Sequence, residues 1–215
     1  MENTLNLSNA TIIKARFVSS ILEGRIGMFS NLDLLIGQEV MYGKHQNFAD
    51  LVIIYKEKLF AIEIKAQNDN FKRLDTQIDS YKKVFDYVYI LTTNNHIKSL
   101  KELNYPNVGI ISIDNDGFKT IKRGSLQKRF SKIDILESIP ASYLSKKYAL
   151  RKNLSAGAVK NTLLQKTTPE LKKVLFEYFN YRIEDSFNNF LEDKGEAIQY
   201  EDISLLSIKN AKVSK

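Results

Sequence analysis

Two acidic residues and a lysine bracket two consecutive apolar segments between residues 48 and 91. Asp50 precedes the run LVIIY, and Glu63 and Lys65 lie near the end of the run LFAIEIK. The short polar break between the runs predicts a hairpin turn, which places the start of the first strand beside the end of the second. Side chains alternate along a strand, so Glu63 and Lys65 face the same side. We therefore expect Asp50, Glu63 and Lys65 to meet at one end of the hairpin.

These residue types suit metal-assisted hydrolysis of a phosphodiester bond. Two neighbouring carboxylates repel each other, and a divalent cation relieves that repulsion. Oxygen ligands with open water positions favour Mg²⁺, for which Mn²⁺ can substitute. Such an ion makes a bound water more acidic and stabilises charge on a phosphoryl oxygen, while a lysine beside it can orient the water or offset negative charge. The alternative for the glutamate–lysine pair alone is an ordinary ion pair on the solvent face of a strand.

The helix expected after this hairpin carries Gln77 and Tyr81, which share a face because they are four residues apart. The whole pattern, D-(x)12-E-x-K followed by Q-x-x-x-Y, resembles the PD-(D/E)XK nuclease superfamily. The Gln/Tyr pair resembles its RecB-like and Cas4-like branch, and residues 49–91 look like a group of small bacterial and phage proteins within it. The resemblance covers about residues 36–115, and Ala49 stands where the motif has a proline that varies widely in the superfamily.

The resemblance implies a role for each matched residue. Asp50 and Glu63 would be metal ligands, and Lys65 would be the catalytic lysine. Gln77 and Tyr81 would line the site and either contact the substrate or order the lysine. The implied fold is a restriction-endonuclease-like α/β fold, with a mixed central sheet flanked by helices.

Members of the superfamily usually have one more acid upstream of the aspartate, and two candidates exist. Glu39 lies in LLIGQEVMYG, a plausible first strand, and Glu23 lies at the end of an expected N-terminal helix. We prefer Glu39 as the further metal ligand, because a strand next to the hairpin could bring its carboxylate to the ion. The alternative is a solvated strand residue.

The implied activity is that of a Mg²⁺-dependent deoxyribonuclease that leaves a 5′-phosphate, in phage biology, defence, restriction or DNA repair. The pattern leaves endonuclease and exonuclease action both open. Many members act as dimers or within larger assemblies, so a homodimer or a larger assembly is open as well. The alternative from another class is a non-catalytic nucleic-acid-binding protein with the same fold, and an RNA nuclease is a third.

Basic residues concentrate in one part of the chain. The formal net charge is +7, and residues 118–173 hold fourteen Lys or Arg against three acids. A basic segment attached to an acidic site suits a polyanion such as DNA, whose binding is driven by counterion release. A solvated helix face is the alternative for each residue, and a helix–turn–helix at residues 142–165 is one way to present them. The candidate DNA contacts are Lys72, Arg73, Lys146, Lys147, Arg151, Lys152 and Lys160.

Composition excludes several other classes of protein. The chain has 215 residues, enough for one good core, and no run approaches the ~20 apolar residues of a membrane helix. Its N-terminus lacks a signal-peptide pattern. The absence of cysteine excludes disulfides and thiolate metal sites, and it fits a cytoplasmic protein. The two histidines, His45 and His96, are expected in loops rather than as ligands.

The remaining pattern predicts a nuclease-like core at residues 1–124 and a basic helical extension at residues 125–215 that packs on it. In the extension we expect a helix, or a helix plus loop, at residues 125–136. A long helix should follow, capped by Thr168 and ending near Asp193. In the core we expect helices at 10–24, 71–85 and within 92–103, and strands at 35–42, 49–56, 59–65, 87–91, 108–113 and 118–122.

Overall fold

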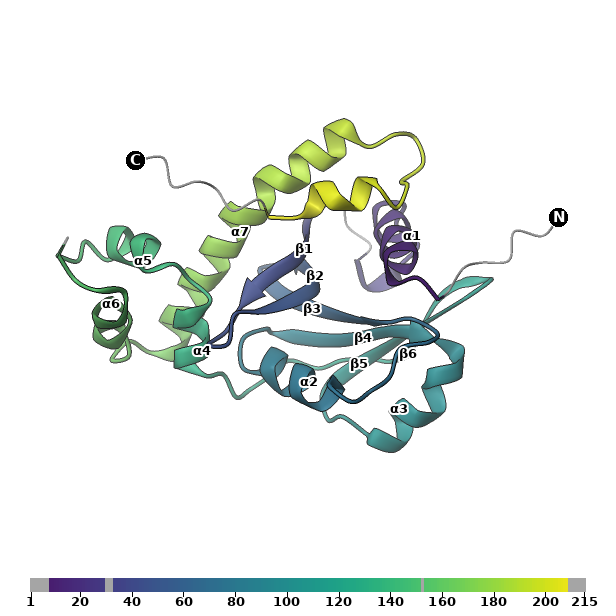
Figure 1. Cartoon of the computed structure of the whole chain (residues 1–215), viewed down its shortest axis with the longest axis horizontal. Helices are drawn as coiled ribbons and strands as arrows, with labels where there is room; N and C mark the ends of the chain where they lie inside the picture. The colour runs from purple at the N-terminus through teal and green to yellow at the C-terminus, as the bar shows by residue number, and fades with distance from the viewer. Residues whose placement is uncertain (1–7, 30–32, 152, 209–215) are drawn as a thin grey trace.

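A mixed six-stranded sheet forms the centre of the protein and is flanked by helices (Figure 1). The computed structural model describes residues 8–29, 33–151 and 153–208. The strands lie across the sheet in sequence order; β1, β2 and β3 are antiparallel, β3, β4 and β5 are parallel, and β6 returns antiparallel to β5. Their bounds are β1 Leu34–Tyr42, β2 Asn47–Tyr55, β3 Lys58–Lys65, β4 Tyr87–Thr93, β5 Val108–Asp114 and β6 Gly117–Lys122.

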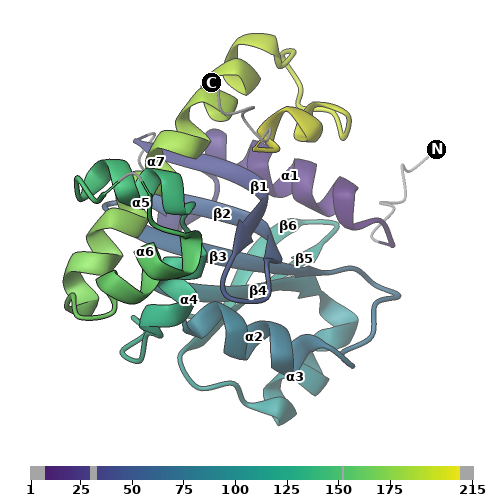
Figure 2. The same cartoon turned by 60° about the vertical axis from the view of Figure 1, so that its left-hand side comes forward.

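Helices connect the parallel strands and make up most of the second half of the chain. Helix α2 joins β3 to β4, and a short helical segment joins β4 to β5. In Figure 2 the helices α4, α5 and α6 gather on one side, next to α7. The α-helices are α1 Ala10–Leu22, α2 Leu74–Lys82, α3 Ile97–Leu103, α4 Lys132–Glu137, α5 Ala141–Lys147, α6 Ala156–Leu163 and α7 Thr168–Asp193; the 3₁₀ helices are η1 Gly27–Phe29, η2 Asn94–His96 and η3 Asp202–Leu206. Within the described residues, no helix combines the length and apolar character needed to cross a membrane.

The long helix α7 and the short helix η3 cover β1, the strand at one edge of the sheet (Figure 1). A paired or covered edge removes a row of unsatisfied backbone groups that would otherwise attract another strand. At its N-terminal end α7 is tied to the turn before β4 by a buried ion pair, in which Lys172 Nζ lies 3.1 Å from Asp86 Oδ1. The same ammonium donates a hydrogen bond to the Val84 carbonyl at 2.7 Å. Helical residues from the second half of the chain therefore complete the core that the first half begins.

The fold class expected from the sequence is confirmed, since the sheet is mixed, flanked by helices and followed by a helical C-terminal part. Some element boundaries differ from expectation, most of all in helix α2, which runs from Leu74 to Lys82 rather than over residues 71–85. The helix or helix plus loop expected over 125–136 forms as a loop followed by α4, which begins at Lys132. The segment before α4 has no regular secondary structure. The Gln127 backbone N–H fixes it to the turn before β4 by donating a hydrogen bond of 2.8 Å to the Asp86 carbonyl. The division into units at residue 124 stays a prediction.

The cap of α7 is also displaced from its expected position. Thr167, not Thr168, is the N-cap, and it forms a capping box with Glu170. Pro169 follows inside the first turn, where a missing N–H costs nothing. The expected cap is wrong by one residue, because two adjacent threonines precede the proline. Only Thr167 has a glutamate three residues later, which is the spacing that a capping box requires.

Candidate active site

The β2–β3 ladder ends where the predicted site begins. The last pair of this ladder is Leu51 with Ile62. Beyond it, a side chain replaces the backbone as acceptor, because the Ile64 N–H donates a hydrogen bond of 2.8 Å to Asp50 Oδ2. The carboxylate satisfies an amide that the ladder leaves unpaired, as a buried backbone donor requires. The two strands therefore separate at Asp50 and leave space for side chains between their ends.

Glu63 and Lys65 form a buried ion pair at this point. Lys65 Nζ lies 2.8 Å from Glu63 Oε1, and the two side chains are 12% and 1% exposed. On the neighbouring strand β4, the Thr92 hydroxyl donates to the Lys65 carbonyl at 2.9 Å and fixes the end of β3. The aspartate, glutamate and lysine singled out by sequence spacing thus come together, as expected from the hairpin.

Helix α2 supplies the next contacts. Gln77 Oε1 accepts a hydrogen bond from Lys65 Nζ at 3.0 Å, and the Tyr81 hydroxyl donates to Glu63 Oε2 at 2.7 Å. Tyr81 is fully buried and stacks on Tyr42, with ring centroids 5.2 Å apart and planes 18° apart. Gln77 therefore orders the lysine, which is one of the two roles expected for this pair. Tyr81 orders the glutamate instead, and it lies too deep to contact a substrate.

Negative charge at the site is only partly compensated. Burial first, and the charge of Glu63 second, raise the pKa of Asp50 from 3.8 to about 6. The Ile64 N–H and the charges of Lys14 and Lys65 act in the opposite direction. A carboxyl group with a raised pKa next to a second carboxylate is a common sign of a functional site. The same repulsion would favour a bound cation.

The two carboxylates fit a hard divalent cation. Mg²⁺ is usually held in proteins by one or two carboxylates, with waters and phosphate oxygens completing an octahedron. Each carboxylate oxygen accepts more than one contact, so the hydrogen bonds that Glu63 already makes leave lone pairs for an ion. Across residues 8–29, 33–151 and 153–208, no three His, Cys, Asp or Glu side chains form a group that could hold a metal. Asp50 and Glu63 would therefore leave the remaining positions to water and substrate.

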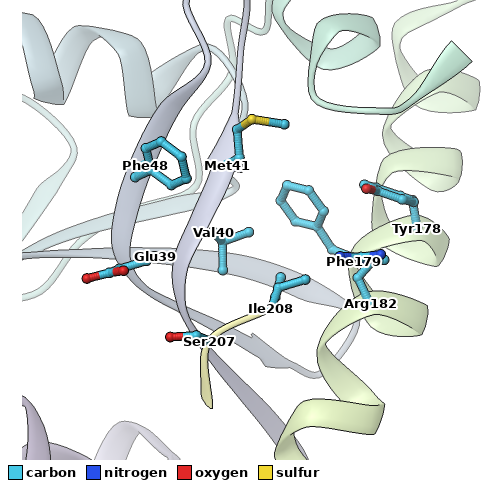
Figure 3. A pocket seen from close by; sticks show the side chains of 9 residues that line it. All are labelled: Glu39, Val40, Met41, Phe48, Tyr178, Phe179, Arg182, Ser207 and Ile208. Carbon is cyan, nitrogen blue, oxygen red and sulfur yellow. The ribbon is translucent and has the colours of Figure 1, made fainter. Parts of the chain in front are cut away.

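Glu39 stands on β1 opposite Asp50, in a rung that is missing from the β1–β2 ladder. Its φ is 49°, and it is the only non-glycine residue inside a described strand with a left-handed backbone. Such strain costs roughly 1–3 kcal/mol and tends to occur at functional sites. The exposed carboxylate lines a hollow of about 200 Å³ between β1 and α7 and points away from α7 (Figure 3). Glu23 instead ends α1 and pairs with Arg25. Metal binding by Glu39 stays a prediction.

A second lysine, which the sequence pattern did not single out, faces the site from α1. Lys14 is 7% exposed, and its Nζ donates to Gln38 Oε1 at 2.9 Å. Burial lowers the pKa of Lys14, while the charges of Asp50 and Glu39 act to raise it. The sequence contains one indication that Lys14 is buried, which is its position within the apolar helix ATIIKARFVSSIL. Its partner, on a distant strand, could not be identified from that indication.

Gln38 connects this lysine to the end of the described chain. Its amide nitrogen donates to the Ile203 carbonyl at 2.6 Å and to Ser207 Oγ at 2.9 Å. An isolated parallel bridge also joins the backbones of Gln38 and Ser207. A buried amide with its donors and acceptor engaged is held in one orientation, so it fixes the lysine beside it.

Two hollows of about 270 Å³ each adjoin the site at the start of α2. Lys65 is in the wall of one and Phe48 in the wall of the other, and both are lined by Arg73 and Gln77. Lys72 and Arg73 are exposed here, at the entrance to α2. Of the predicted DNA contacts, Arg73 therefore lies in the same hollow as Lys65, and Lys72 is its neighbour in the chain.

The other predicted DNA contacts lie on α5, on α6 and in the segment between them, and they are Lys146, Lys147, Arg151, Lys152 and Lys160. Lys160 Nζ lies 2.6 Å from Glu137 Oε2, and Lys147 Nζ lies 2.6 Å from Glu177 Oε2. These ion pairs offset part of the positive charge expected for DNA. Lys152 falls outside the described residues, and contact between this group and DNA stays a prediction.

Comparison with known proteins gives one family match. Residues 4–207 match the family described as bacteriophage P4 protein cII. The chain belongs to this family. The matched range includes every residue that forms the candidate site, from Lys14 to Tyr81. No curated protein matches the sequence.

Among solved structures, the SPO1766 protein of unknown function from Silicibacter pomeroyi is similar to this P4 cII family member. The two share 15% sequence identity, the alignment covers 68% of this chain and 90% of the other, and the TM-score is 0.41. A likeness of that size carries no argument about activity.

Proposed function

We propose that this P4 cII family member is a Mg²⁺-dependent nuclease of the PD-(D/E)XK type that hydrolyses phosphodiester bonds in DNA. The observation that carries the proposal is the meeting of Asp50, Glu63 and Lys65 where β2 and β3 separate. Gln77 and Tyr81 hold the lysine and the glutamate of this group in single orientations. An ordinary ion pair on a solvent face would have neither the burial nor these supporting contacts.

Each side chain has a distinct task in this proposal. Asp50 and Glu63 would hold Mg²⁺, which when bound acidifies a water and offsets charge on the phosphoryl oxygen. Lys65 Nζ has three donors, and its contacts with Glu63 and Gln77 leave one for a phosphate oxygen or the attacking water. The water oxygen forms a bond to phosphorus as the bond to the 3′-oxygen breaks. The 3′-oxygen takes up a proton, and the phosphate stays on the 5′ side of the product.

Two further features support DNA as the substrate. The exposed Arg73 shares a hollow with Lys65, and the exposed Lys72 precedes it in the chain, so a phosphate next to the reacting one would have a cationic neighbour. The family takes its name from a bacteriophage protein, which favours phage biology as the setting. RNA would offer the same phosphates, so it is the comparison substrate.

A non-catalytic nucleic-acid-binding protein is the second candidate. The observation in its favour is that Lys65 already neutralises Glu63 at 2.8 Å, as a purely structural ion pair would. In that case Lys65→Ala would lower stability, because it leaves a buried carboxylate unpaired, and neither the parent protein nor the variant would cleave DNA.

The deciding experiment is cleavage of circular single-stranded DNA, supercoiled DNA, linear DNA and RNA in Mg²⁺, in Mn²⁺ and in EDTA. The test variant is Lys65→Ala, and the matched control is Lys58→Ala, an exposed lysine at the other end of the same strand. Metal-dependent cleavage lost in the first variant and retained in the second supports the proposal. Cleavage that persists in Lys65→Ala rejects it, and salt-sensitive binding without cleavage of any substrate favours the binding protein.

A further inference from the structure

Phe48 combines high exposure with a position next to the candidate site. It is 60% exposed, a value that only Tyr181 equals among the large apolar side chains of the described residues. Phe48 precedes Asp50 by two positions on β2, beside the rung that is missing between Glu39 and Asp50. Its partner across the β1–β2 ladder is Met41, which is itself 41% exposed. Two exposed apolar side chains beside a charged site indicate a contact surface rather than a chance exposure.

Phe48 is one of the residues that line the hollow of about 270 Å³ between the β1–β2 hairpin and α2, and it also lines the hollow of about 200 Å³ between β1 and α7. Asn47 and Ser80, joined by a hydrogen bond of 2.9 Å, provide neutral polar groups in the same lining. Arg73 and Gln77 complete the side toward α2, and no acidic side chain is among the described residues that line it. The hollow therefore offers an aromatic face, a guanidinium group and neutral hydrogen-bonding groups.

Arg73 and Gln77 also line the adjoining hollow that contains Lys65. The two hollows thus form neighbouring compartments, one with the lysine of the candidate site and the other with an aromatic ring. A nucleotide has the same two parts, an anionic phosphate and a flat base.

We propose that the Phe48 hollow takes the base of an unpaired nucleotide whose phosphate lies at Lys65, which makes single-stranded DNA the preferred substrate class. The inference rests on the proposed nuclease function, and it extends that function to the form of the DNA. An unpaired base stacks on an aromatic ring or an Arg guanidinium, and its free edge hydrogen-bonds to neutral groups. A base within a duplex is stacked between its neighbours and paired, so it cannot enter such a hollow without being flipped out.

The chain contains no tryptophan, so Phe48→Trp places a single indole in the hollow. We would titrate this variant in EDTA with an oligothymidylate and with a blunt-ended duplex. The control is Tyr200→Trp, which puts a single indole at an exposed aromatic position. The proposal is supported if the oligothymidylate quenches the indole fluorescence of Phe48→Trp to saturation. The duplex should have little effect on that fluorescence, and neither DNA should quench the Tyr200→Trp control. Absence of quenching, or equal quenching at both positions, overturns the proposal.

Binding of labelled oligothymidylate gives the size of the effect. Loss of one base–aromatic stack in Phe48→Ala should weaken binding roughly 5- to 150-fold, while Tyr200→Ala should leave it unchanged. Because these measurements use no metal, they succeed or fail independently of cleavage. If Phe48→Ala instead converts a dimer to a monomer in solution without changing DNA binding, the surface is an interface between copies and the proposal is wrong.

Discussion

Asp50→Asn should make the protein more stable at neutral and alkaline pH while abolishing its proposed activity. The pKa of Asp50 is raised from 3.8 to about 6 in the folded protein. One pKa unit corresponds to about 1.4 kcal/mol, so keeping this group ionised costs about 3 kcal/mol of folding free energy. Asparagine removes the charge and keeps an oxygen that can accept the Ile64 N–H.

The pH dependence of this effect has a definite sign. An acid with a raised pKa binds more protons in the folded state than in the unfolded state between pH 3.8 and about 6. Its favourable contribution is therefore complete below about pH 4 and is lost as the pH rises through about 6. The advantage of Asp50→Asn should be near zero at pH 4 and should approach about 3 kcal/mol at pH 8.

Urea unfolding, monitored by circular dichroism in EDTA at pH 4, 6 and 8, measures the free energy of unfolding of the variant and of the parent protein. A gain of about 3 kcal/mol corresponds to a rise in Tm of roughly 6–12 °C for a chain of this size. Asp116→Asn, at an exposed turn, is the matched control and should show no such pH dependence. The reasoning is refuted if Asp50→Asn is no more stable than the parent at pH 8, or if its gain is the same at pH 4.

Three further substitutions test packing at the site and elsewhere in the fold, each by urea unfolding beside the parent protein. Tyr81→Phe keeps the buried ring but leaves a buried carboxylate oxygen without its donor, so it should cost about 1–3 kcal/mol, and an unchanged stability would contradict the hydrogen bond. Lys172→Ala breaks a buried ion pair and should cost about 3–5 kcal/mol, whereas Lys173→Ala, exposed on the same helix, should stay within about 0.5 kcal/mol. Gly109→Ala would force a Cβ into the ring of Tyr89 and should cost about 1–3 kcal/mol, and a neutral result would mean that the ring is free to move.

Local chemistry made the central part of the site predictable from sequence. Asp50, Glu63 and Lys65 lie on one hairpin, and the alternation of side chains determines which of them face each other. The spacing of Gln77 and Tyr81 likewise placed both on one helix face. These relations depend on the period of a strand or a helix, and they hold whatever the rest of the chain does.

Contacts between distant segments could not be predicted in the same way. Lys14 meets Gln38 because α1 packs against the sheet, and no sequence period relates the two positions. The neutralisation of Lys160 by Glu137 depends on how α4 and α6 pack together. The burial of Tyr81 likewise depends on Tyr42, which stacks on it from β1. Because Tyr81 is buried, its hydroxyl contacts Glu63 and not a substrate.

The hydrogen bonds of Gln38 have a consequence for synthesis of the protein on the ribosome. The hairpin with Asp50, Glu63 and Lys65 can form early, since it needs only neighbouring residues. The acceptors of the Gln38 amide, at Ile203 and Ser207, lie 165 and 169 positions further along the chain. A nascent chain that has not yet reached them can build the carboxylate pair but cannot lock the glutamine that holds Lys14. The setting of the site is thus completed only when nearly all of the described chain has been made.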